Sequence, residues 1–145
     1  MQRAKVIIDT NVLVSAFIFG GKPLQVIRKT FKTTEVYVSP KILTEYKETP
    51  RELEKEKKIS SYQFELLIES IASFVSESII VYPEKRLYIC KDPEDDMLLE
   101  CCFKVKADFL ITGDKKLLEI KMSKLPQEIK SLKIINPSQF VQITY

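Results

Sequence analysis

The sequence has no histidine and no tryptophan, and only three of its 145 residues are glycine. Because histidine is the side chain that most often transfers protons near neutral pH, a metal-free hydrolytic mechanism lacks its usual general acid and base. The three cysteines, Cys90, Cys101 and Cys102, are an odd number, and an adjacent pair does not easily bridge to itself. These absences argue against imidazole catalysis and a disulfide framework, and they indicate a reducing compartment.

Long apolar runs are also absent. Asp9 and Asn11 interrupt the apolar stretch near the amino terminus too early for a signal peptide or a membrane span. We therefore expect a cytoplasmic protein with no membrane association. The sequence has no Walker A run, no G-x-S-x-G elbow and no G-x-G-x-x-G after its first predicted strand, so the functions that depend on these motifs lack their residues.

The composition that remains is that of an ordinary globular protein, with 45% hydrophobic and 30% charged residues. A chain of 145 residues is long enough for one core, and no repeat, low-complexity tract or linker divides it. We expect a single domain over residues 1–145. The net charge of +3 permits binding to an anionic polymer but does not indicate it.

Short apolar runs rich in β-branched residues alternate with helical patterns along the chain. Strands are predicted at residues 4–8, 36–38, 79–82, 109–112 and 133–135, with a further extended piece at 87–90. Helices are predicted at 12–19, from 23, from 40, from 60, from 93, at 115–120, and from 137 toward Tyr145. The alternation predicts an α/β fold, a three-layer α/β/α sandwich around a central, mainly parallel sheet.

Four acidic residues lie where strands end or near the starts of helices. Asp9 and Asp114 follow predicted strands, and Asp96 is close to the start of a helix. Glu45 lies at the edge of the buried stripe of another helix. Since the carboxyl ends of parallel strands meet at one edge of a sheet, we expect these side chains to converge. Each acid alone is adequately explained as a helix cap or a solvated residue, but the group is harder to explain in that way.

Converging carboxylates need a partner, because two of them about 4 Å apart at an effective dielectric near 20 repel by roughly 4 kcal/mol. Protonation, basic neighbours or a divalent cation can offset this repulsion. With no histidine and no paired cysteine motif, structural zinc is disfavoured, whereas oxygen ligands suit Mg²⁺ or Mn²⁺. Such an ion polarises a phosphoryl oxygen and activates water, which makes phosphodiester hydrolysis the resulting hypothesis.

Four segments, at residues 6–13, 42–45, 92–101 and 107–114, carry a resemblance to a known family. In this order they resemble the PIN-domain nucleases, and most closely the branch of toxin components related to the VapC toxins of toxin–antitoxin systems. The resemblance extends over nearly the whole chain. It implies a PIN-like fold and a magnesium- or manganese-dependent endoribonuclease that cuts RNA, commonly forms a homodimer and is often inhibited by a cognate antitoxin.

The resemblance also implies roles for individual residues. The catalytic and metal-binding acids would be Asp9, Glu45, Asp96 and Asp114. Asn11 and Thr112 match the polar residues that orient carboxylates or water. The identity of the third ligand stays open, because Asp92 or Asp95 could share this role with Asp96. We also expect Asp92 to cap a helix.

Basic and aromatic residues near the acids are candidates for RNA contacts. The lysines in question are Lys47, Lys91, Lys115 and Lys116, with Lys115 or Lys116 favoured, although a solvated surface is the ordinary explanation for any one of them. Tyr46 and Tyr88 could stack on bases, but packing in or beside the core is the better expectation for both.

Two rival functions remain open. A catalytically inactive RNA-binding module would keep the fold and the RNA contacts, but the presence of all four acids favours an active enzyme. A phosphatase-type domain would use Asp9 as a nucleophile. Such domains usually have a second aspartate two residues further on, where this chain has Asn11, so this function is disfavoured.

Overall fold

The computed structural model describes residues 3–143, in which strands and helices alternate. Its strands are β1 (Ala4–Ile8), β2 (Thr34–Val38), β3 (Ile79–Ile80), β4 (Phe109–Ile111) and β5 (Lys133–Ile135). All neighbouring strands run parallel, in the order β3-β2-β1-β4-β5. The predicted α/β fold with a parallel central sheet is confirmed.

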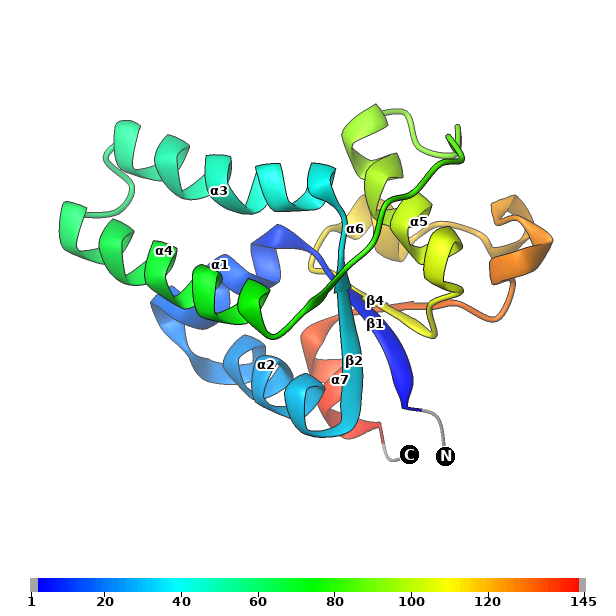
Figure 1. Cartoon of the computed structure of the whole chain (residues 1–145), viewed down its shortest axis with the longest axis horizontal. Helices are drawn as coiled ribbons and strands as arrows, with labels where there is room; N and C mark the ends of the chain where they lie inside the picture. Colours follow the sequence, from blue (N-terminus) through cyan, green and yellow to red (C-terminus); the bar gives the residue numbers. More distant parts are fainter. Residues whose placement is uncertain (1–2, 144–145) are drawn as a thin grey trace.

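The helices lie on both sides of this sheet. They are α1 (Thr10–Phe19), α2 (Gly21–Thr33), α3 (Pro40–Lys55), α4 (Ser61–Ser76), α5 (Pro93–Val105), α6 (Lys115–Leu118) and α7 (Pro137–Gln142), with 3-10 turns η1 (Met122–Lys124) and η2 (Gln127–Ile129) before β5. α5 packs against β1 and β2, whereas α2 packs against α1, β2 and α7. In Figure 1, α2 and α7 lie across the strands from α5, and α3 and α4 form a helical hairpin at the left. The three-layer prediction is therefore confirmed.

Several predicted boundaries differ from the structure by a few residues. The segment predicted as a strand at 79–82 forms one only at Ile79–Ile80, because β2 ends at Val38, which pairs with Ile80. Residues 87–90, predicted as an extended piece, lie outside the sheet, and the N–H groups of Leu87, Ile89 and Cys90 donate to side-chain carboxylates. The last helix ends at Gln142, and Tyr145 lies outside the described residues.

α1 and α2 meet at a sharp bend. Gly20 and Gly21 have φ values of +71° and +64°, a conformation that residues with a Cβ rarely adopt. Within residues 3–143, no single helix is long and apolar enough to cross a membrane. α1 and α2 meet the criteria of length and composition only as a pair, and that pair is bent by 112°.

Tyr46 anchors α3 to the end of β1. Its side chain is fully buried, its ring packs edge-on against Phe74 with the centroids 6.0 Å apart, and its hydroxyl donates to the carbonyl oxygen of Ile8. Because Ile8 immediately precedes Asp9, this bond fixes the backbone that carries Asp9. The expectation that Tyr46 packs in the core is confirmed.

The Tyr46→Phe substitution tests this anchor. Phenylalanine keeps the ring but removes the hydroxyl that donates to Ile8, and the loss of such a buried bond costs about 1 kcal/mol. We expect the melting temperature, followed by circular dichroism, to fall by about 2–4 °C. Tyr62→Phe, at an exposed position of α4, is the control and should melt like the wild type. Equal melting of all three proteins would contradict the anchoring role.

Candidate functional site

The order of the strands reverses between β1 and β4. From β1 the chain continues through β2 to β3 on one side of the sheet, whereas β4 leads to β5 on the other. Ile8 is level with Ile111 in the ladder, so the residues after both strands emerge side by side. Open parallel sheets bind ligands in the crevice at such a reversal, beyond the carboxyl ends of the strands.

Asp9 is the first residue after β1 and lies in this crevice. Its carboxylate accepts hydrogen bonds from the Thr10 N–H and the Thr112 hydroxyl, both at 2.7 Å, and only 7% of the residue is exposed. Burial raises the pKa of the Asp9 carboxyl. The hydrogen bonds from Thr112 and Thr10 only partly offset this effect, and the charge of Asp114 adds to it. The fold therefore holds a carboxylate in an environment that disfavours its charge.

The turn after β4 supports Asp9 from the neighbouring strand. The Thr112 hydroxyl, which donates to Asp9, also accepts from the backbone N–H of Asp114 at 2.9 Å. Asn11 links the same two strand ends, because its Oδ1 accepts from the Gly113 N–H at 3.3 Å. Asp114 then caps α6 by accepting from the Lys116 N–H at 2.9 Å. The side chains of Thr112 and Asn11 thus fix the relative positions of Asp9 and Asp114.

Glu45 approaches the crevice from α3. Its carboxylate accepts a hydrogen bond from the Thr10 hydroxyl, and the side chain is half-buried. Burial raises the pKa of the Glu45 carboxyl, and the negative charges of Asp9, Glu94 and Asp95 raise it further. Thr10 therefore connects the α3 carboxylate to the start of α1, one residue from Asp9.

The first turn of α5 contributes Asp95 to the crevice, whereas Asp96 lies elsewhere. Burial raises the pKa of the Asp95 carboxyl, and the charges of Asp114, Asp92 and Asp9 add to this, while Lys116 lowers it. Asp95 is therefore an electrostatic neighbour of both strand-end aspartates. Asp92 caps α5 as predicted, accepting from the Glu94 N–H at 3.0 Å.

Asp96 was expected to project toward the other acids, and the structure differs. The residue is only 4% exposed, and its Oδ1 accepts from the backbone N–H groups of Ile89 at 3.1 Å and Cys90 at 2.8 Å. Consecutive residues of a helix point about 100° apart, so the Asp95 and Asp96 side chains leave α5 in different directions. Asp96 is bonded to the segment before α5.

Asp95→Ala and Asp96→Ala should have opposite consequences. Removal of the Asp96 carboxylate leaves two backbone N–H groups without their acceptor, which costs about 2 kcal/mol or more, so we expect the melting temperature to fall by roughly 5 °C. Asp95→Ala removes a carboxylate whose charge is disfavoured by burial and by three other acids, so its melting temperature should not fall. Thermal unfolding in EDTA measures both. A larger fall in melting temperature for Asp95→Ala than for Asp96→Ala would contradict the positions that the structure gives to these two side chains.

The switch-point acids, defined as Asp9, Glu45, Asp95 and Asp114, are neighbours without being in a closed arrangement. Among residues 3–143, no three Asp, Glu, Cys or His side chains are grouped closely enough to hold a metal ion as they stand. Within the same residues, the ion pairs involve none of these four acids. Hard oxygen donors that form no ion pair have the chemistry that Mg²⁺ and Mn²⁺ require, so the donor set fits a divalent cation.

The lysines proposed for RNA contacts lie at different distances from these acids. Lys116 and Lys91 line a pocket of about 340 Å³ together with Asp95 and Asp92. Lys115 and Lys47 are exposed on α6 and α3. Lys47 is two residues from Glu45, so the two side chains point to different sides of the helix. Of the lysines in this pocket, Lys116 is the one whose charge lowers the pKa of Asp95.

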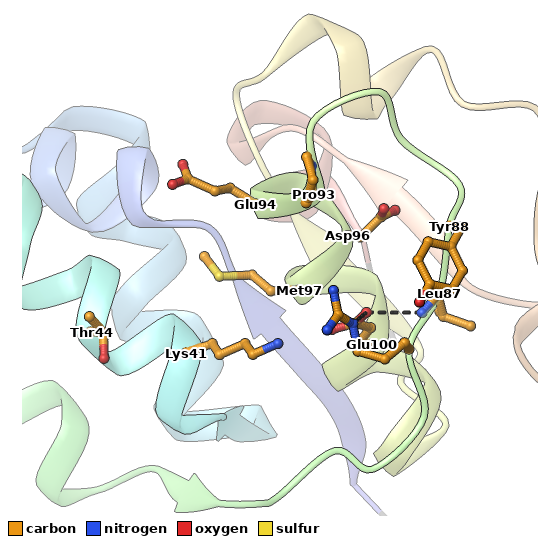
Figure 2. Close-up of a pocket in the computed structure, with 10 residues that line it drawn as sticks. Lys41, Thr44, Leu87, Tyr88, Pro93, Glu94, Asp96, Met97 and Glu100 are labelled. Carbon is orange, nitrogen blue, oxygen red and sulfur yellow. Dashed lines mark hydrogen bonds and ion pairs between the residues drawn. The ribbon is translucent and has the colours of Figure 1, made fainter.

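Sequence reasoning missed the carboxylates that hold residues 87–90 in place. Glu100, on α5, is buried and accepts from the Leu87 N–H at 2.9 Å, one turn beyond the similar bonds of Asp96 (Figure 2). Tyr88, expected to pack beside the core, is 82% exposed. The pattern at 87–90 predicted only an extended piece, and only the three-dimensional arrangement identifies side-chain carboxylates as its hydrogen-bond partners.

An open, parallel α/β sheet with acidic side chains at its reversal point defines a class of ligand-binding and catalytic domains. Within that class, residues 5–116 match the family model described as "PIN domain", which is most of the chain. The chain belongs to the PIN domain family. PIN domains are generally nucleases that use divalent metal ions, and the resemblance inferred from the sequence is confirmed.

Two similar proteins extend this comparison. The protein MJ1680 of Methanocaldococcus jannaschii, which is described as uncharacterized, is 29% identical over 144 residues, covering 97% of this chain and 91% of its own length. A crystal structure of VapBC2 from Rickettsia felis, bound to a DNA fragment from its promoter, superposes with a TM-score of 0.60. That match covers 91% of this chain and 98% of the other at 15% identity, so it supports the fold alone.

Proposed function

We propose that this protein is a metal-dependent endoribonuclease that hydrolyses RNA phosphodiester bonds with Mg²⁺ or Mn²⁺. The observation that carries the proposal is the buried Asp9 carboxylate at the reversal of strand order, surrounded by other acids and held by Thr10 and Thr112. A fold that isolates a charge without a cationic partner loses stability, so such an arrangement needs a functional reason. Cation binding supplies that reason.

The switch-point acids would hold the cation, which would act as a Lewis acid on the phosphodiester group. We assign the α5 carboxylate to Asp95 and not to Asp96, because Asp95 is the electrostatic neighbour of Asp9, Asp114 and Glu45. Thr112 orients Asp9 by its hydroxyl, and Asn11 keeps the two strand ends together. Lys116, beside Asp95, would attract a backbone phosphate of the RNA.

We further propose that the protein is the toxin of a toxin–antitoxin pair and acts as a homodimer. Support comes from membership of the PIN domain family and from the similarity in fold to the VapBC2 complex, whose name refers to such a pair. A toxin requires a cognate antitoxin, usually encoded beside it. Expression of this chain alone should inhibit growth, and coexpression with a neighbouring small gene should restore it. Equal growth in both cases would contradict the toxin role.

The enzymatic proposal is tested with end-labelled RNA. Purified protein should cleave the RNA when Mn²⁺ or Mg²⁺ is present and should not cleave it in excess EDTA. Single-stranded DNA of the same sequence serves as the second substrate. Cleavage that is equal with and without EDTA, or that disappears when trace contaminants are removed by further purification, would refute the proposal.

One observation favours a second candidate, an RNA-binding module without catalysis. As noted above, the acids within residues 3–143 do not form a ready metal-binding group. If the side chains do not close around a cation, the protein would bind RNA without cleaving it. RNA binding with no Mn²⁺-dependent cleavage and no change in thermal stability on addition of Mn²⁺ would favour this candidate.

A further inference from the structure

A pocket of about 360 Å³ opens beside the site, between the start of α3, the first half of α5 and residues 86–88 (Figure 2). We call it the Tyr88 pocket. Its exposed lining includes Lys41, Arg86, Tyr88 and Glu94, none of which takes part in the mechanism proposed above. In Figure 2, Lys41 extends from α3 toward α5, on the side of the pocket opposite Tyr88.

The segment that carries Tyr88 is fixed and not free to collapse. Leu87 is buried, and its N–H donates to Glu100, while the N–H groups of Ile89 and Cys90 donate to Asp96. Since Leu87 points to the core, the side chains on either side of it, Arg86 and Tyr88, remain exposed. A surface that is already ordered loses little conformational entropy when a ligand binds.

Tyr88 presents an aromatic face together with a cation. The residue is 82% exposed, and the Arg86 guanidinium carbon lies 5.9 Å from the centroid of its ring. Proteins that bind single-stranded nucleic acids use exposed aromatic rings, on which bases stack, and cationic groups that follow the backbone. Tyr82 and Lys85 continue the same pattern in an adjoining pocket of about 170 Å³.

The charge of the Tyr88 pocket suits an anionic strand. Asp96 and Glu100 also line it, but both are buried and already accept backbone hydrogen bonds. Arg86 also lies 4.0 Å from the Glu100 carboxylate, a long ion pair that leaves its side chain exposed. The exposed charged groups are the cations of Lys41 and Arg86 and the single carboxylate of Glu94.

An adjoining pocket of about 210 Å³, which shares Lys41, Thr44, Glu94 and Met97 with the Tyr88 pocket, has the opposite character. This second pocket also contains Glu45, Glu48 and Glu52. A polyanion is repelled by that surface, so the Tyr88 pocket is the favoured route away from the acids. The shared lining also means that the Tyr88 pocket begins next to Glu45.

We propose that the Tyr88 pocket is a nucleotide subsite for single-stranded RNA, in which one unpaired base stacks on Tyr88 while Lys41 and Arg86 bind the adjacent phosphates. This inference rests on the proposed function and deepens it, because it assigns the path of the strand on one side of the switch-point acids. Duplex RNA is excluded from the subsite, since a paired base does not offer its face to the ring.

Binding of fluorescent single-stranded RNA, measured by anisotropy in EDTA so that no cleavage occurs, tests the subsite. Tyr88→Ala should weaken binding about tenfold, because base stacking on an aromatic side chain is lost. Tyr88→Phe keeps the stacking face and should bind like the wild type. Tyr62→Ala is the matched control, since Tyr62 is also highly exposed, at 71%, but lies on α4 away from the pocket.

Oligonucleotides with an abasic nucleotide at successive positions provide the decisive measurement. At one position, loss of the base should weaken binding to the wild type about tenfold but should not weaken binding to Tyr88→Ala further. Unchanged binding by Tyr88→Ala, or the absence of any such coupled position, would overturn the subsite. If Tyr88→Ala instead loses binding of a protein partner while RNA binding is unchanged, the pocket is a protein-docking site and the proposal is wrong.

The same experiment separates this inference from the proposed function. Coupling between Tyr88 and one base without any metal-dependent cleavage would support the subsite and refute the nuclease proposal. Metal-dependent cleavage by the wild type, with no effect of Tyr88→Ala on RNA affinity or on KM, would support the nuclease proposal and refute the subsite.

Discussion

Asp9→Asn is expected to reduce metal-dependent RNA cleavage by at least about a thousandfold. The substitution keeps the size of the side chain but removes its charge at the position where we propose that the cation binds. Lewis-acid stabilisation of a phosphoryl transition state is worth several kcal/mol, and about 1.4 kcal/mol corresponds to a factor of ten in rate. Initial rates on labelled RNA in Mn²⁺, with matched amounts of wild-type and variant protein, measure the loss.

The same substitution should leave the metal-free fold at least as stable as the wild type. Because burial raises the pKa of Asp9, its ionised form is less favourable in the folded protein than in the unfolded chain. At neutral pH this penalty is present in the wild type and absent from Asp9→Asn, whose amide oxygen can still accept from the Thr10 N–H. Thermal unfolding in EDTA should therefore show no decrease in melting temperature.

Asp108→Asn is the matched control for Asp9→Asn. Asp108 immediately precedes β4, at the opposite end of the sheet from the crevice, and it accepts from the Lys5 N–H at 2.8 Å, a bond that asparagine can retain. We expect full cleavage activity from this variant. Equal activity of Asp9→Asn and the wild type would refute the proposed role of Asp9, whereas equal inactivation of both variants would point to an effect of charge in general.

Addition of Mn²⁺ should raise the melting temperature of the wild type by about 5–10 °C. A ligand at about 100 times its dissociation constant stabilises the folded state by roughly 2.7 kcal/mol, and each kcal/mol corresponds to about 2–4 °C in a domain of this size. The gain should exceed what ionic strength alone provides, because the cation relieves repulsion among the switch-point acids. Differential scanning fluorimetry over a range of Mn²⁺ concentrations measures it.

Asp9→Asn should lose most of this stabilisation, and Asp108→Asn should keep it. Calorimetric titration with Mn²⁺ provides a second readout that does not depend on unfolding. If Mn²⁺ raises the melting temperatures of the wild type and of Asp9→Asn equally, the cation binds elsewhere, and the assignment of the switch-point acids is incorrect. Because neither measurement uses RNA, both distinguish loss of metal binding from loss of substrate binding.

The strand ends were predictable because their signals are local. The run from Val6 to Ile8 is apolar and β-branched and stops at Asp9, and the apolar run Phe109–Ile111 is followed closely by Asp114. Because the strands are parallel, their carboxyl ends lie at the same edge of the sheet, so no other information is needed to predict that Asp9 and Asp114 are neighbours. The neighbourhood of Asp9, Thr112 and Asp114 therefore followed from sequence pattern plus one rule of topology.

The rotation of α5 was not predictable in this way. Asp95 and Asp96 are adjacent acids with similar local surroundings in the sequence, and the direction in which each points depends on how the chain enters the helix. That entry is fixed by the hydrogen bonds from Ile89 and Cys90 to Asp96. The same bonds explain why residues 87–90 resemble a strand in sequence but do not join the sheet, and why Tyr88 is exposed.

The pairing of β1 with β4 has a consequence for synthesis on the ribosome. Val6 pairs with Phe109, so the first strand to be translated waits for a partner that emerges about a hundred residues later. Such distant contacts form slowly because a long loop must close first. Asp9 and Asp114 therefore come together only after most of the chain has emerged from the ribosome, so the switch-point acids are not assembled during most of translation.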